Sequence, residues 1–334
     1  MEKPTVSALV LNGIESFEKK VQAEQAEGIY GKVTTDKAQY GMYYKNLKTG
    51  EPMSPEEHQK LIESTGKKRE HQKQYAMLGQ EVKKRTHLRV LTDKTKEIKL
   101  NMTAKTLGMM MMILGETKWM TEDADRGLLV KDGQPMRVKD FAQLFGKSQR
   151  PTMTILKELD DAGFLIRRGE TASVKYYINP EFNIMGKSIA QEGNFTRLYH
   201  EDIKELMSTE RLVDGEMKRL SPEALGYFYK LMAFMSLNFN CLAHNPEETD
   251  KANLKLIFKK DLPALTNTSR PSVTKYLNEL NTFGVIGEFK LYGNKSLIPN
   301  PKYAFRGDNY ETYRQVTEAF SAIANKMDQQ EETQ

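Results

Sequence analysis

Residues 141–187 read FAQLFGKSQRPTMTILKELDDAGFLIRRGETASVKYYINPEFNIMGK, and this stretch decides the expected fold. Its periodicity predicts a helix, a turn and a second helix with leucines along one face. Gly163 ends the second helix, because a residue that tolerates positive φ suits the reversal of the chain. Two strand-forming runs follow, Phe164–Ile166 and Val174–Ile178, with a charged loop between them. A helix-turn-helix followed by such a β-hairpin, or wing, is typical of a winged helix.

The same pattern occurs again 121 residues later, in register and without a gap. The matching positions are Ser148 with Ser269, Leu156 with Leu277, Leu159 with Leu280, Gly163 with Gly284, Asn179-Pro180 with Asn300-Pro301, and Gly186 with Gly307. Upstream, Leu107-Gly108 in an apolar helix expected over residues 100–114 has a counterpart in Leu225-Gly226 of residues 220–237. Two copies in register indicate a tandem repeat. The sequence therefore predicts a mainly α protein with small β-hairpin wings, built as two tandem winged helix-turn-helix domains.

The repeat and the composition divide the chain of 334 residues into five segments. We expect an N-terminal arm and small hairpin (1–66), a first winged-helix domain with a basic segment (67–187), a polar helical connector (188–219), a second winged-helix domain (220–308), and a C-terminal helix with a disordered tail (309–334). An amphipathic stretch at Val6–Glu27 either packs on its own domain or contacts a partner. The methionine-rich helix of residues 100–114 is either core or a subunit contact.

The charge is mildly basic, at a net +5 and a pI of about 8.9. This balance permits nucleic acid as a partner without requiring it. The strongest concentration of cations comprises Lys67, Lys68, Arg69, Lys73, Lys83, Lys84, Arg85, Arg89, Lys94, Lys96 and Lys99. Such a run forms either a solvated face or, beside DNA-binding modules, a set of phosphate contacts.

Other function classes lack their sequence signals. No apolar run is long enough to cross a membrane, and no signal-peptide pattern opens the chain, so we expect a cytoplasmic protein. The single cysteine, Cys241, excludes an intrachain disulfide and a cysteine-based zinc site. The five histidines lack metal-ligand spacing, and neither a complete phosphate-binding loop nor Gly-x-Ser-x-Gly occurs. We therefore expect no enzyme, no catalytic residues, no metal and no cofactor.

Candidate DNA contacts follow from the expected fold, since the second helix of a helix-turn-helix presents its outward N-terminal residues to base edges. In the first copy these are Gln149, Arg150, Met153, Thr154 and Lys157, and in the second they are Ser269, Arg270, Ser272, Thr274, Lys275 and Asn278. The wings add Arg167, Arg168 and Lys175, and then Lys290, Asn294 and Lys295. Arginine suits guanine, glutamine suits adenine, and wing cations suit phosphate or the minor groove. The expected partner is double-stranded DNA.

A strand followed by Asn-Pro and a later Gly, placed after a helix-turn-helix, resembles the RepL family, replication proteins of small plasmids in Firmicutes. The segment most similar to that family is Asn300-Pro301-Lys302-Tyr303-Ala304-Phe305-Arg306-Gly307-Asp308. Tyr40–Lys45 followed by Thr49-Gly50-Glu51 is similar to the family's start. Family members usually carry a single winged helix, whereas two are expected here. The resemblance implies a plasmid or phage replication initiator or maintenance protein that binds iterated or paired sites.

Two alternatives stay open at this level. A transcriptional regulator of the phage-repressor type would need the same fold, and fold does not fix function. A non-specific DNA-binding or protein-scaffolding module in segregation or assembly is the other, because winged helices also contact proteins. Self-association and replication-machinery proteins are further partners under consideration.

Overall fold

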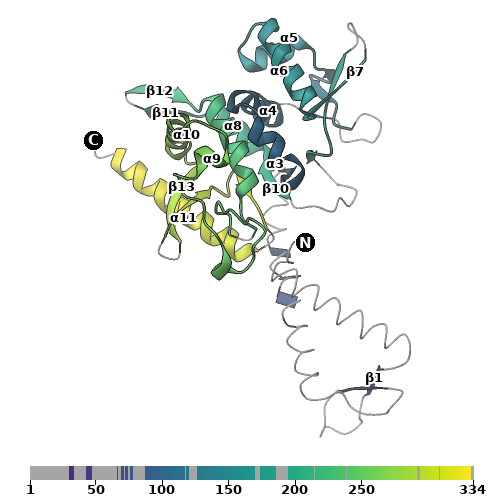
Figure 1. Ribbon diagram of the computed structural model, residues 1–334, viewed down its shortest axis with the longest axis vertical. Helices are drawn as coiled ribbons and strands as arrows, with labels where there is room; N and C mark the ends of the chain where they lie inside the picture. The colour runs from purple at the N-terminus through teal and green to yellow at the C-terminus, as the bar shows by residue number, and fades with distance from the viewer. Residues whose placement is uncertain are drawn as a thin grey trace.

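A computed structural model describes residues 87–331, apart from short gaps at 117, 120–125, 170–173, 186–194, 214, 238, 292–293 and 308 (Figure 1). It also describes two strands near the N-terminus and single positions between residues 66 and 77. The expected arm of Val6–Glu27 and much of the basic run, including Lys83, Lys84 and Arg85, lie outside the described residues.

The described elements are short helices and strands. The helices are α3 (Thr92–Asn101), α4 (Ala104–Glu116), α5 (Val138–Phe145), α6 (Gln149–Asp161), α7 (His200–Ser208), α8 (Pro222–Leu231), α9 (Leu262–Leu265), α10 (Arg270–Thr282), α11 (Tyr310–Glu331), and the 3-10 helices η2 (Met232–Phe234) and η3 (Lys251–Asn253). The strands are β1 (Tyr30–Val33), β2 (Tyr43–Asn46), β3 (His87–Leu91), β4 (Lys118–Trp119), β5 (Leu129–Lys131), β6 (Gln134–Pro135), β7 (Leu165–Arg168), β8 (Lys175–Ile178), β9 (Asn183–Met185), β10 (Phe195–Tyr199), β11 (Glu210–Val213), β12 (Glu216–Arg219), β13 (Ile286–Leu291), β14 (Asn294–Pro299) and β15 (Ala304–Phe305).

The predicted fold class, a mainly α protein with two tandem winged helix-turn-helix domains, is wrong. The described residues are about half helix and a quarter strand, and their strands form several small antiparallel sheets. One sheet has the order β15-β10-β3-β9, so it joins strands from both expected domains and from the segment between them. A single hydrophobic cluster runs from Leu88 to Ala304 and includes side chains of both copies. Because separate domains share few contacts, the two copies are parts of one packed body.

The centre of this body is the pair β3 and β10, which run antiparallel with Leu88 opposite Leu198. Strand β9 extends the sheet beside β3, and β15 extends it beside β10. Strand β10 belongs to residues 188–219, which the sequence predicts to be a polar helical connector. Leu198 and Tyr199 of that strand have no exposed surface, so the supposed connector supplies a core strand.

The helices α4 and α8 cross in contact and carry the repeated Leu-Gly pairs. A methyl group added at Gly108 would lie 1.8 Å from the carbonyl oxygen of Pro222, and one at Gly226 would lie 1.8 Å from that of Ala104. Glycine is therefore required at both positions, because only its missing side chain lets the two backbones approach so closely. Three of the four methionines of α4, Met109 to Met111, are buried in the hydrophobic core, and Met112 packs against it, which confirms the core interpretation of that helix.

The repeat does persist in local structure. Helix α10 starts and ends 121 residues after α6, and an antiparallel hairpin follows each helix, β7 with β8 and β13 with β14. Asn179 Nδ2 donates to the carbonyl oxygen of Gly163, and Asn300 Nδ2 donates to that of Gly284, both at 2.7 Å. Figure 1 shows α4 and α8 between the two helix-and-hairpin units.

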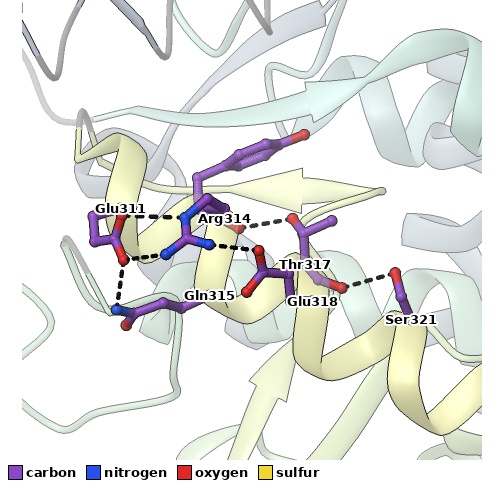
Figure 2. A network of polar contacts seen from close by, with 7 residues as sticks. Glu311, Arg314, Gln315, Thr317, Glu318 and Ser321 are labelled. Carbon is purple, nitrogen blue, oxygen red and sulfur yellow. Dashed lines mark hydrogen bonds and ion pairs between the residues drawn. The ribbon is translucent and has the colours of Figure 1, made fainter.

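Helix α11 covers one side of this body. Its Tyr313 ring meets Phe305 edge-on with centroids 5.1 Å apart, and its Phe320 ring meets Phe289 at 4.9 Å. On the other face Arg314 contacts Glu311 at 2.7 Å and Glu318 at 2.6 Å, within a network that includes Gln315, Thr317 and Ser321 (Figure 2). The hydrogen bonds from Arg314 lower the pKa of Glu311. Exposed pairs of this kind stabilise a helix only slightly.

Candidate nucleic-acid interface

Helix α6 presents the predicted outward face to solvent. Its apolar side chains, Ile155, Leu156 and Leu159, are buried. The candidate contacts Gln149, Arg150, Met153, Thr154 and Lys157 are all exposed, and Met153 has 58% of its surface accessible. Periodicity alone separated the two faces, because residues three and four apart share one side of a helix.

Helix α10 is less open at its start. Ser269 is the N-cap residue, and its hydroxyl accepts the backbone N–H of Ser272 at 3.4 Å and donates to the Ser272 hydroxyl at 2.8 Å. These two serines therefore serve the helix terminus in this structure, a use that suits serine at an N-cap. Ser272 and Thr274 are half-buried, and the exposed candidates are Ser269, Arg270, Lys275 and Asn278.

The hairpin β7–β8 places two cations directly opposite each other, since Arg168 pairs with Lys175 across the strands. Arg168 is exposed, and its guanidinium lies 4.7 Å from the centroid of the Tyr177 ring. The side chain of Arg167 is exposed, and its backbone N–H donates to Asp160 at 3.0 Å. Like charges that face each other across a sheet destabilise it. The pairing of Arg168 with Lys175 therefore does not stabilise this hairpin.

The hairpin β13–β14 repeats the arrangement with different residues. Lys290 and Lys295 are directly opposite partners, one step farther from the helix than the pair in the first hairpin. Lys295 is exposed and lies 3.6 Å from Glu288. The side chains of Lys290 and Asn294 lie outside the described residues.

A groove beside the first hairpin brings three further cations, Lys131, Arg137 and Lys139, close to Lys175. It has a volume of about 670 Å³. Its charged lining residues are Lys131, Arg137, Lys139, Lys175, Asp132 and Asp140. Asp140 accepts the backbone N–H of Arg137 at 2.8 Å at the start of α5, so one of the two carboxylates is already engaged. The signal available in the sequence is the set of cations before and at the start of a helix, Lys131, Arg137 and Lys139.

Two charged side chains outside the helix-and-hairpin units contribute to the packed body of the protein. Lys99, counted among the solvated or phosphate-binding cations, is fully buried, with its Nζ 4.0 Å from the centroid of the Tyr229 ring. Burial and the nearby Arg306 lower its pKa to about 7. In the acidic loop at residues 245–250, Glu247 pairs with the buried guanidinium of Arg306. Lys99 is therefore excluded from DNA contact, and Glu247 has a structural role.

Other kinds of site were sought among the described residues. In that part of the chain no three His, Cys, Asp or Glu side chains are grouped so that they could hold a metal ion. None of its helices is both long and apolar enough to cross a membrane. Comparisons of the chain with protein-family models, with curated proteins and with solved structures found no match.

Proposed function

We propose that the protein binds duplex DNA through its two helix-and-hairpin units. The observation that carries this proposal is the pair of cations that face each other in the first hairpin, Arg168 and Lys175. A phosphate group between two such cations removes their repulsion and forms charge-assisted hydrogen bonds. This pair therefore fits a partner whose surface carries closely spaced negative charges, as the DNA backbone does.

The helices supply the groups that can distinguish bases. Arg150 and Gln149 lie at the exposed start of α6, and Arg270 lies at the exposed start of α10. Arginine and glutamine form bidentate hydrogen bonds with guanine and adenine in the major groove. Since α6 packs on α4, α10 packs on α8, and α4 packs on α8, both units are held by one core. Such an arrangement suits paired or iterated DNA sites, with one helix-and-hairpin unit bound to each site.

The resemblance to the RepL family supports a particular setting for this activity, that of a replication initiator or maintenance protein acting on plasmid or phage DNA in the cytoplasm. A transcriptional regulator would bind through the same surfaces. The location of the bound sites distinguishes the two roles. Purified protein mixed with sheared DNA of the replicon that carries its gene should enrich a repeated site, which lies at the origin for an initiator and over a promoter for a regulator.

The first test of DNA contact is the salt dependence of binding. We predict that Arg168→Ala together with Lys175→Ala reduces the slope of log K against log salt by about 2, because each lost phosphate contact removes about 0.9 from that slope. Fluorescence anisotropy with labelled duplex DNA at several salt concentrations measures it. Lys204→Ala, at an exposed position on α7, is the matched control and should leave the slope unchanged. A slope equal to the control's would remove the hairpin from the interface, and no binding at low salt would overturn the proposal.

A further inference from the structure

The hairpin β11–β12 carries an apolar pair in an unusual place. Leu212 and Met217 are cross-strand partners, with 66% and 61% of their surfaces exposed. They are the two most exposed large apolar side chains in the described residues. Gly215, which precedes β12, takes a φ of +78°, which suits glycine. Every residue of β12 is exposed.

The hairpin has an inner strand, β11, and an outer strand, β12. On the inner side, Arg211 of β11 donates to the carbonyl oxygen of Thr282 at 2.6 Å, which ties the hairpin to the end of α10. In the part of the chain that the structure describes, β12 pairs with β11 and with no other strand. A two-stranded hairpin has marginal stability, and an exposed edge strand offers its unpaired backbone groups to another strand.

The sequence of β12, Glu216-Met217-Lys218-Arg219, indicates which strand fits this edge. When two copies of one strand pair antiparallel about a two-fold axis, one residue faces itself and its neighbours exchange partners. With Met217 on the axis, Glu216 of each copy faces Lys218 of the other. With Lys218 or Glu216 on the axis, identical charges would face each other, which is unfavourable. The strand is therefore complementary to itself in the register centred on Met217.

We infer that β12 is a self-association surface, on which a second copy of this chain adds its own β12 to form a four-stranded antiparallel sheet. In this sheet Leu212 and Met217 of one copy and the same residues of the second copy lie in one row on one face, because directly opposite residues share a face. Their exposed apolar surfaces cover one another. On the other face two Glu216–Lys218 pairs form between copies, in place of the contact of 3.3 Å that these residues make within one chain.

Charge reversal tests this register with the full-length protein in the absence of DNA. We expect a dimer in sedimentation velocity for the wild type. Glu216→Lys alone gives four facing cations and Lys218→Glu alone gives four facing anions, so each variant should sediment as a monomer. An equimolar mixture of the two variants should sediment as a dimer again, since lysines of one chain then face glutamates of the other. Recovery in the mixture also shows that both variants are folded.

A cysteine at the axis provides an independent readout. Cys241 is buried, so Met217→Cys introduces an accessible thiol that faces its own copy, and mild oxidation should join the two chains. Met153→Cys, at the exposed methionine of α6, is the control and should stay uncrosslinked. A wild-type monomer at all concentrations, a dimer that survives both charge reversals, or a mixture that stays monomeric would overturn the inference. None of these outcomes bears on DNA binding, which is measured separately.

Discussion

At the scale of single residues, the repeated Asn-Pro pair has a structural meaning. Asn179 and Asn300 each hold the glycine that ends the preceding helix, through a side-chain bond to its carbonyl oxygen. Each also accepts a backbone N–H two residues later, from Glu181 at 3.0 Å and from Lys302 at 2.9 Å. The side chain thus connects the end of the helix to the end of the following hairpin. The repeat in the sequence is a repeat of this junction.

Loss of the junction should be measurable. We predict that Asn300→Ala lowers the free energy of unfolding by about 1–3 kcal/mol, because it leaves a partly buried carbonyl and an N–H without their partner. Urea denaturation followed by circular dichroism measures the change. Asn281→Ala, at an exposed position near the end of α10, is the matched control. Equal stability of the two variants would show that the junction contributes nothing.

The candidate site was predictable where a residue's role depends on local periodicity. The exposed face of α6 follows from the spacing of its leucines. Ser269 was harder to interpret, because serine at the start of a helix suits both an N-cap and a DNA contact. Lys99 was misjudged because its burial depends on Tyr229, far away in the sequence. Which lysine in a charged run is buried is decided by tertiary packing, which local composition does not report.

At the scale of elements, the crossing of α4 and α8 makes the structure sensitive to a single methyl group. We predict that Gly226→Ala lowers the free energy of unfolding by about 1–3 kcal/mol or more, the usual effect of overpacking, because backbone atoms of α4 cannot move aside alone. Thermal unfolding measures it. Gly66→Ala is the control, since a methyl group there meets no atom within 4 Å. Wild-type stability of Gly226→Ala would contradict the close crossing.

The same scale explains why the fold prediction was wrong. The helix-and-hairpin units could be predicted from the sequence because each is formed by neighbouring residues and its helix is followed by a glycine. The central sheet was not, because β3, β9, β10 and β15 are short strands far apart in sequence. Pairing between distant strands leaves no local signal beyond a few apolar residues. The two copies therefore looked like separate domains, although β3 and β10 join them.

At the scale of the whole molecule, buried lysines link stability to pH. Burial lowers the pKa of Lys99 to about 7 and that of Lys230 to about 8, whereas both titrate at 10.5 when exposed. Lys230 donates to the carbonyl oxygens of Thr266 and Leu100, while Lys99 faces Tyr229 and Arg306. Between these folded and unfolded pKa values the unfolded chain binds more protons, so stability rises with pH.

We predict that the free energy of unfolding increases from pH 7 to pH 9, by up to about 1.4 kcal/mol per pH unit for each lysine that titrates. Denaturant titrations at several pH values measure it, and they stay below the range in which tyrosine ionises. Lys99→Met keeps the length of the side chain without its charge, so it should raise stability at pH 7 and flatten the pH dependence. A wild-type profile that falls over this range would show that these lysines are not held in apolar surroundings.

The order of the central sheet also governs how the chain can fold as it is made. Strand β10 needs β15 at its outer edge, but roughly a hundred residues separate them. At a synthesis rate of about 5–20 residues per second, β10 waits on the order of 5–20 s for its neighbour to leave the ribosome. During that interval the nascent sheet has an open edge at Leu198, which is fully buried in the finished protein. Vectorial synthesis thus leaves this edge open to wrong pairing until β15 has been made.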